Sequence, residues 1–559
     1  MFSEMNFSGR VLKWSVALLL IIFYALTAPQ NHAEAEDAYD YALKVEQGAF
    51  ADQTGVNRVL ALPMFGMVYD DATALGYSGR AFGFMVFLNR LLAVGCIFLF
   101  WKLVGGTRSV ASIGRHSVRP SSDNDKYPTR NPSESDRSST ISHQLVPVLG
   151  LAFSYGFWRY ANEAETYMLA MFAMLGAWVL AVKGRWIWCV FVSALGVLIH
   201  LLNVVPLLLI IPLYYLLSRN VKRAVVHGFL TSLFICMGYA ACSPWLDFSE
   251  LGAQHHSIEA GFSGGNMVRA IAAFGQNVVS GNFLFGFGRI RELLTGLFPS
   301  RVLVEEFYMA KHMPVWIPWV GLATLSLLVV CSLWFVVLLC KTGWKSVCSC
   351  FTLQAYNFQP LTLSALVWLL LYAVAVLRTE AGSPELWIMA LVPFCLLAHG
   401  AWSMGHGVGG KPSAVSWLLL ASLFTHNLVA GLLPVMPEES DYHAAKGQWL
   451  EEHAQPSDLI LTSYEPVMIF YLDYFALGEV VNSGSHPEKD IERLIDGTSG
   501  TVYALDSFFH PLEPMRIRSP ELYEKMRGIG LDFAPRFEKV HDDEFGGIYR
   551  LIDDGREHG

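Results

Sequence analysis

Residues 11–41 read VLKWSVALLLIIFYALTAPQNHAEAEDAYDY and join a long apolar run to an acidic segment. A membrane-spanning helix needs about 20 mainly apolar residues, and residues 11–28 come close to that length. No small-residue cleavage site follows closely, so we interpret this run as a membrane anchor and not as a cleaved signal peptide. The acidic residues of segment 34–41 then follow the membrane surface directly, which makes them candidates for chemistry there.

The composition of the whole chain is typical of a protein that lies mostly in a membrane. Of its 559 residues, 53% are hydrophobic and 16% are charged, whereas about 25% are charged in an average soluble protein. This apolar composition and a net charge of −9 exclude a disordered chain, a collagen and a nucleic-acid-binding protein. We therefore predict a polytopic α-helical membrane protein with about 11 transmembrane helices. The candidate spans are 11–28, 83–105, 144–159, 164–182, 187–200, 203–218, 224–242, 314–340, 360–379, 385–403 and 413–434.

The orientation follows from Lys and Arg in the loops, because positive charge stays on the cytoplasmic side. Loop 106–143 carries six of these residues and is rich in Ser, Pro, Asn and Asp, so we predict a disordered cytoplasmic linker there. The turns 160–163 and 380–384 carry none and are placed on the other side. We expect an integral protein of the inner or plasma membrane, with a cytoplasmic N-terminus and with segments 29–82 and 243–313 outside.

The acidic C-terminal segment, residues 436–559, differs in composition from the membrane part, residues 1–435. It contains 25 Asp and Glu against 11 Lys and Arg, a net charge of −14, which leaves +5 for the rest of the chain. We predict a small extracytoplasmic α/β domain that folds independently and selects the acceptor without performing chemistry. The expected strands are Leu459–Thr462, Val480–Asn482, Thr501–Leu505 and Gly547–Leu551, and the expected helices are 440–454, 487–496 and 519–528.

The first candidate site is the carboxylate pair Glu36 and Asp37 in the segment that follows the first span. A carboxylate this close to a membrane surface can act as a general base or bind a divalent metal ion. The alternative is a solvated acidic helix start, since acids are favourable at a helix N-terminus. Local sequence alone leaves both interpretations open.

A second candidate site lies in the turn between the third and fourth spans. Residues 154–167 read SYGFWRYANEAETY and place Glu163 and Glu165 at the outer membrane edge. Ionisable groups inside a membrane are costly and are often functional. The alternative is that both glutamates pair with Arg159 in an interfacial turn.

Arginines in the outer segments are candidates for binding a phosphate group. The planar guanidinium group matches phosphate oxygens in geometry and charge. The alternative for each is that the side chain reaches toward lipid headgroups from an apolar surface. Residues 266–287 are apolar but interrupted by polar residues, which predicts a helix lying in the membrane interface. The candidate phosphate-binding residues are Arg58, Arg269, Arg289 and Arg291.

Three features in this order resemble the GT-C superfamily of membrane glycosyltransferases. They are the acidic loop after the first helix, the Trp/Glu/Tyr-rich turn between helices three and four, and a His-x-x-Asn junction at His200 and Asn203. The resemblance is to the protein-mannosyltransferase-like and RgtA-like branch, and it covers roughly residues 10–435 in topology. It implies that an acidic residue of the first outer loop, here Asp37, activates the acceptor or supports a metal ion.

This sequence departs from the family pattern at two places. Glu36-Asp37 reverses the Asp-Glu order that is common in the family, so the choice between these two carboxylates stays open. Many relatives also have a His in the stretch that matches Asn57-Arg58-Val-Leu, and its absence here leaves that role unassigned.

The resemblance implies a hexosyl or pentosyl transferase that moves a sugar from a polyprenyl-phosphate-linked donor to an acceptor at the outer membrane face. The acceptor is a glycan, a lipid or a protein, the surroundings are membrane lipids, and no nucleic acid is involved. In this hypothesis Asp37 or Glu36 is the base, and Glu163 or Glu165 orients the acceptor or completes a metal site. The arginines hold the departing phosphate, and a divalent metal ion is the only cofactor expected.

The competing hypotheses are a transporter or lipid flippase, and a non-catalytic assembly protein. Transporters tend to have internal repeats and broken helices near mid-membrane, and we find no convincing repeat in this sequence. Arg90, inside the second span, is the residue that favours transport.

Overall fold

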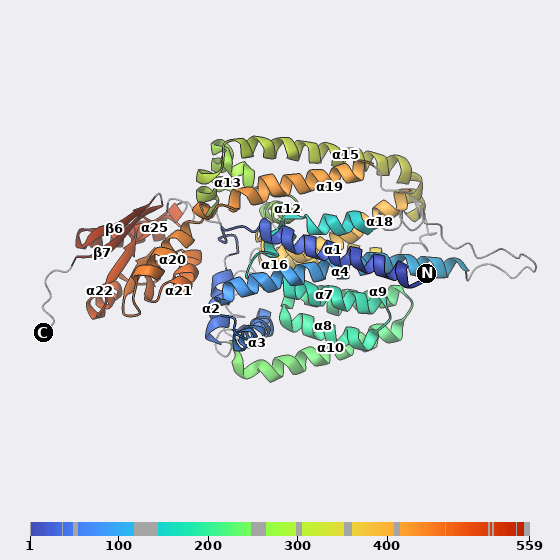
Figure 1. Cartoon of the computed structure of the whole chain (residues 1–559), viewed down its shortest axis with the longest axis horizontal. Helices are drawn as coiled ribbons and strands as arrows, with labels where there is room; N and C mark the ends of the chain where they lie inside the picture. The colour runs from blue at the N-terminus through green and yellow to red at the C-terminus, as the bar shows by residue number, and fades with distance from the viewer. Residues whose placement is uncertain are drawn as a thin grey trace, which may run out of the picture.

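The computed structural model of the chain is a bundle of helices with a small mixed sheet beyond one end of it (Figure 1). The helices run roughly along the longest axis, and the C-terminal sheet, orange to red, follows the bundle end where α2 lies. The structure describes residues 2–35, 37–48, 54–116, 144–247, 264–297, 304–351, 360–406, 414–463, 465–512, 515–516, 519–543 and 545–552.

Five stretches of the described residues are long and apolar enough to cross a membrane, and further apolar helices are shorter. The protein is therefore a polytopic helical membrane protein, while the count of 11 spans remains a prediction. The five are Ala81–Gly105 in α4 (Ala81–His116), α10 (Val221–Cys242), Trp316–Trp334 in α15 (Trp316–Phe351), α16 (Pro360–Thr379) and Ala414–Val435, which begins with α19 (Ala414–His426). The shorter ones are Trp14–Leu26 in α1 (Phe2–Leu26), α7 (Tyr167–Val182), α8 (Trp186–Ile199), Leu201–Leu217 and Pro384–Gly400.

Two expectations about the membrane helices need correction. The third predicted span is broken: residues 144–152 are helical, Ser154 is extended, and α6 (Tyr155–Tyr160) is a separate short helix. The predicted linker begins as helix, because α4 continues to His116, and residues 117–143 lie outside the described part of the chain. Because of the break at Ser154, α6 is a separate short helix. All of its residues are buried, including the polar residues Tyr155 and Arg159.

The junction at residues 200–203 is a tight hairpin. His200 has an extended backbone, and the Asn203 side chain donates hydrogen bonds to the carbonyls of Gly196 and Ala170 at 2.9 and 3.1 Å. The next helix then packs back against α8, where Leu207 fills the space beside Gly196. The Asn203 side chain therefore ties the reversal to both α8 and α7.

The centre of the bundle is built around α7, whose residues are apolar on all sides. A helix of this kind is stable when it is buried all round, and α7 packs against both α4 and α8. Trp178 of α7 stacks on Trp368 of α16, with ring centroids 5.6 Å apart and planes 4° from parallel. Because α7 begins directly after Glu165, this rigid core fixes the turn that carries the two candidate glutamates.

The two predicted outer segments meet in space. Strand β1 (Thr54–Gly55), in the first of them, pairs in parallel with β2 (Leu246–Asp247), in the second. The second segment continues with α12 (Gly264–Val278), η5 (Asn282–Gly286), α13 (Gly288–Leu297) and α14 (Val304–His312). The pairing agrees with the expectation that both segments lie on one side of the membrane.

The C-terminal segment forms a five-stranded sheet in the order β4-β3-β5-β7-β6. Strands β3, β4 and β5 are parallel, while β7 is antiparallel to β5 and β6. The strands are β3 (Leu459–Thr462), β4 (Glu479–Asn482), β5 (Val502–Leu505), β6 (Phe537–Asp543) and β7 (Gly546–Leu551), and the main helices are α20 (Tyr442–His453), α21 (Pro466–Phe475), α22 (Glu488–Gly497) and α25 (Pro520–Phe533).

The four predicted strands and three predicted helices of this segment are present, with ends that shift by a few residues. Strand β6 and helix α21 were not predicted. The sequence of β6, FEKVHDD, is charged and largely exposed, so it lacks the apolar pattern of a buried strand. Such polar residues are common in edge strands, where they discourage pairing with other chains. The apolar sequence PVMIFYLDYF shows no helical periodicity because α21 buries more than one face.

The C-terminal segment is packed against the first outer segment. Tyr39 of α2 (Ala38–Gln47) stacks on Phe82 with ring centroids 4.3 Å apart, and it also contacts Tyr471 and Phe475 of α21. These residues belong to one buried apolar cluster that contains side chains from both parts of the chain. Independent folding of the C-terminal segment remains a prediction, but its position relative to α2 is fixed by this core.

Two glycines of α25 give a matched test of the packing of the C-terminal sheet. A Cβ atom on Gly530 would lie 2.3 Å from the Phe508 carbonyl oxygen, whereas one on Gly528 would meet nothing within 4 Å. We expect Gly530→Ala to lower the free energy of unfolding by about 2 kcal/mol or more through overpacking. Gly528→Ala should raise it by up to about 1 kcal/mol through helix propensity.

Thermal unfolding and limited proteolysis of the full-length purified protein would measure both changes. Equal stability of the two alanine variants would contradict the close approach of α25 to the chain at Phe508.

Candidate functional site

Asp37 lies at the start of α2, directly after the loop that leaves the first helix. Its side chain does not cap the helix, as an ordinary acidic helix start would. Instead its Oδ2 atom accepts hydrogen bonds from the Tyr41 hydroxyl and from Arg58 Nη1, the latter at 3.2 Å. The carboxylate is 36% exposed, so it is held by two partners and still open to solvent.

Arg58 connects Asp37 to a second group of polar side chains. Its Nη2 atom donates to the Tyr167 hydroxyl at 3.4 Å, and that hydroxyl donates to Glu385 at 3.1 Å. Burial alone would lower the pKa of the guanidinium, but Tyr167, Asp37, Glu165 and Glu385 together raise it above its usual value. The guanidinium group of Arg58 is therefore a permanent cation. Glu385 in α17 (Pro384–Trp387) also belongs to the candidate site, although its sequence position did not predict this.

Glu163 is the centre of a buried network of charged groups. It is 0% exposed, forms an ion pair with Arg159 Nη2 at 2.9 Å and is hydrogen-bonded to His32 Nδ1 at 2.6 Å. Arg159, 1% exposed, also pairs with Glu34 at 3.2 Å and donates to the Asn31 carbonyl at 2.7 Å. The interpretation of Glu163 as a partner of Arg159 is therefore confirmed, and its full burial keeps it from direct contact with a substrate.

Two further residues extend this network to the second outer segment. The Tyr155 hydroxyl donates to Glu34 at 2.7 Å and accepts from the side chain of Asn282 in η5 at 2.8 Å. Glu34 belongs to the acidic segment 34–41 that the sequence already marks as a candidate. His32 and Tyr155 carry no comparable signal in the sequence.

Glu165 lies in the turn between α6 and α7, outside both helices, and it is also fully buried. Burial and the nearby Glu385 raise the pKa of this carboxyl well above its usual range, against the opposite influence of Arg58. The turn itself is held by Asn89, whose side chain donates to the carbonyls of Glu163 and Glu165 at 2.7 Å each. Burial therefore favours the protonated form of Glu165, whereas Glu163 faces the charge of Arg159 in an ion pair.

The remaining predicted site residues are placed differently. Arg269 lies on α12 beside Gly382, and α12 packs against α6 and α17. Arg289 and Arg291 lie on α13, which packs against η5. The structure thus joins Arg58 directly to Asp37 and puts the other three arginines on neighbouring helices. Glu36 lies outside the described residues, so the choice between Glu36 and Asp37 stays open.

The part of the site that the structure describes contains no cluster of metal-ligating side chains. Within the described ranges, no three His, Cys, Asp or Glu side chains are grouped closely enough to hold one. His32 and Glu163 approach each other, but both already serve the buried ion-pair network. Metal dependence therefore stays an untested expectation.

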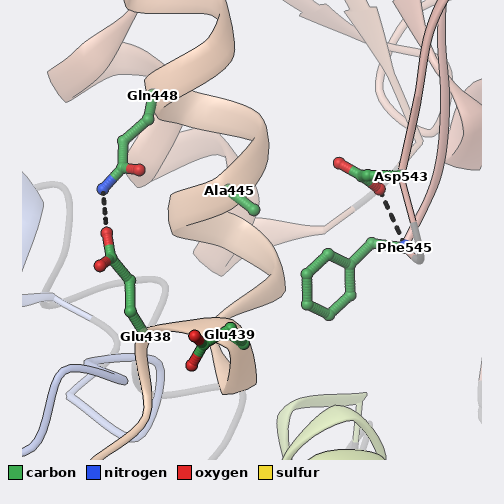
Figure 2. Close-up of a pocket in the computed structure, with 6 residues that line it drawn as sticks. All are labelled: Glu438, Glu439, Ala445, Gln448, Asp543 and Phe545. Atoms are coloured by element: carbon green, nitrogen blue, oxygen red, sulfur yellow. Dashed lines mark hydrogen bonds between the residues drawn. The ribbon is translucent and has the colours of Figure 1, made fainter.

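A pocket of about 380 Å³ lies in the C-terminal segment, between α20 and the turn that joins β6 and β7 (Figure 2). Glu438 accepts a hydrogen bond from Gln448, and Asp543 pairs with the buried Lys446 at 2.7 Å. These carboxylates already have protein partners. The pocket is lined by Glu438, Glu439, Ala445, Gln448, Asp543 and Phe545, and not by the residues around Asp37.

Comparison with known proteins finds similarity to solved structures. No family model and no curated protein matches the sequence. Crystal structures of ArnT from Cupriavidus metallidurans, one bound to undecaprenyl phosphate and one in the apo state, are similar with TM-scores of 0.47 and 0.44. Each is 11% identical in sequence, and 98% of both chains is covered.

The two buried glutamates allow a direct test of the network. Glu163→Gln removes the charge that Arg159 faces, and breaking a buried ion pair on one side costs about 3 kcal/mol. Glu165→Gln replaces a carboxyl whose protonated form is favoured by burial with an amide of the same shape, so we expect a change below about 1 kcal/mol.

Unfolding of the two full-length variants in detergent, followed by tryptophan fluorescence, would compare these losses. Similar losses for both variants would show that Glu163 carries no special ionic role.

Proposed function

We propose that this protein is a glycosyltransferase that moves a sugar from a polyprenyl-phosphate-linked donor to an acceptor at the outer membrane face. The observation that carries the proposal is the pairing of a solvent-accessible carboxylate, Asp37, with a permanent cation, Arg58, directly after the first apolar helix. A base and a cation side by side suit a reaction in which a hydroxyl loses a proton while a phosphate departs.

In the proposed reaction Asp37 is the general base. Both described contacts of its carboxylate fall on Oδ2, and we assign the proton transfer to Oδ1. The acceptor hydroxyl passes its proton to Oδ1 as its oxygen attacks the anomeric carbon of the sugar. The bond between that carbon and the donor phosphate oxygen breaks, and the electron pair stays on the phosphate.

Arg58 stabilises the charge that grows on the departing phosphate. Fixed cations aimed at a developing charge lower the barrier because they need no reorganisation during the reaction. Tyr167 and Glu385 hold the far side of the guanidinium and keep it oriented. Arg269, Arg289 and Arg291 on α12 and α13 are proposed as further phosphate contacts, and Glu163 and Glu165 as supports of the site.

A lipid-linked donor suits a site at the outer end of a helical membrane bundle. Nucleotide sugars do not reach the outer face, whereas a polyprenyl phosphate presents its headgroup at the membrane surface. The sugar is a hexose or a pentose, and the acceptor is a glycan, a lipid or a protein. No described contact favours transport, since Arg90 donates to Asn162 at 2.8 Å and so belongs to the turn beside the site.

The test is transfer by the purified protein in liposomes that contain a radiolabelled polyprenyl-phosphate sugar. We expect Asp37→Asn to reduce turnover at least about 100-fold, because the amide cannot accept the proton. The matched control is Asp40→Asn on the same helix, whose carboxylate pairs with Lys44 at 2.6 Å and should be dispensable.

Full turnover in Asp37→Asn would remove Asp37 from its role as base. Movement of the labelled lipid across the bilayer without sugar transfer would support a flippase instead.

A further inference from the structure

We propose that Asp441, in the C-terminal segment, is a positioning residue that holds the loop carrying the catalytic base. This inference rests on the proposed function and assigns to the C-terminal segment a part in the geometry of the reaction. It departs from the expectation that this segment serves only to select the acceptor.

Asp441 joins two parts of the chain through the two oxygens of one buried carboxylate. Its side chain is 1% exposed. Oδ1 caps α20 by accepting from the backbone amides of His443 and Ala444 at 3.1 and 3.0 Å. Oδ2 accepts from the Tyr471 hydroxyl at 2.8 Å and from the backbone amide of His32 at 3.0 Å. The carboxylate therefore fixes the loop and its own helix at the same time.

Neighbouring backbone contacts hold the same loop. The amides of Gln30 and Asn31 donate to the Val435 carbonyl at 3.1 and 3.0 Å. The Asn31 side chain donates to the Ser440 carbonyl at 2.8 Å. Three consecutive residues of the loop are thus bound to residues 435–441 by hydrogen bonds, which leaves little freedom where the C-terminal segment begins.

The position of His32 is passed along the loop to Asp37. The ring of His32 is fixed by Glu163 at 2.6 Å. The amide of Ala35 donates to the His32 carbonyl at 2.9 Å, and the amide of Ala38 donates to the Ala35 carbonyl at 2.9 Å. These two turns define the path from His32 to the start of α2, where Asp37 lies. A displacement at His32 therefore moves the base.

Contacts of Arg80 also hold the C-terminal end of α2 against the C-terminal segment. Arg80 pairs with Glu46 at the end of α2 and with Glu451 of α20, at 3.3 and 3.1 Å. It also donates to the Tyr474 carbonyl at 2.6 Å. Both ends of α2 are thus tied to the C-terminal segment.

The test compares Asp441→Asn with Asp458→Asn in the full-length protein. The asparagine at 441 keeps an oxygen that can cap α20 but places an NH2 group against the His32 amide, so two donors face each other. Asp458 is also buried and accepts from the amides of Gln455 and Thr501, both at 2.7 Å, but these contacts lie within the C-terminal segment. It therefore controls for loss of stability in that segment.

We expect Asp441→Asn to reduce kcat about 10- to 100-fold with donor KM within about threefold, because small misplacements of a catalytic group have effects of this size. Hydrogen exchange of residues 28–40 should be faster in Asp441→Asn and unchanged in Asp458→Asn. Asp458→Asn should lower the unfolding temperature and keep kcat near that of the wild type.

Wild-type kcat and unchanged exchange of residues 28–40 in Asp441→Asn would overturn the proposal. Equal losses of kcat in the two variants would also overturn it, because they would show a general effect of destabilisation. If the wild type transfers no sugar, the proposed function fails, and faster exchange of residues 28–40 in Asp441→Asn alone would still show that Asp441 positions the loop.

Discussion

The buried ion pair between Arg159 and Glu163 is the interaction on which the outer end of the bundle depends. Neither charge could remain in the interior alone, because an unpaired buried ion costs several kcal/mol. Arg159 has its neutralising partners in the turn that follows its own helix and on the loop of Glu34, and it also binds the Asn31 carbonyl. The loop after the first membrane helix is therefore shaped around a charge that belongs to a different part of the chain.

This arrangement separates charges that support the site from charges that are available for chemistry. Glu163 and Arg159 are buried and neutralise each other, whereas Asp37 and Arg58 form a pair that remains partly open to solvent. Opposite charges attract each other more strongly in the protein interior than in water, so the buried pair is held firmly in place. The open pair can exchange its mutual contact for contacts with a substrate, as the proposed roles of Asp37 as a base and Arg58 as a phosphate-binding cation require.

Much of the fold was predictable from local sequence, and the candidate site was predictable only in part. The length of an apolar run and the signals of a strand are local, so the membrane class and four of the five strands of residues 459–551 could be predicted from the sequence. Asp37, Glu163 and Arg58 stood out as charged residues at a membrane edge. His32 and Glu385 did not, because their contacts are with partners 131 and 218 residues away. No periodicity in the sequence records such contacts.

The hydrogen bonds from Asn31 to Ser440 and from His32 to Asp441 connect residues 409 positions apart. During synthesis the first loop leaves the membrane long before its partners exist. The Arg159–Glu163 pair, four residues apart, can form as soon as its own helix is inserted, but the loop has to wait for residues 435–441. Chains that stop within the membrane part would thus lack the partners of this loop, so that the proposed site could become ordered only after residues 435–441 had been made.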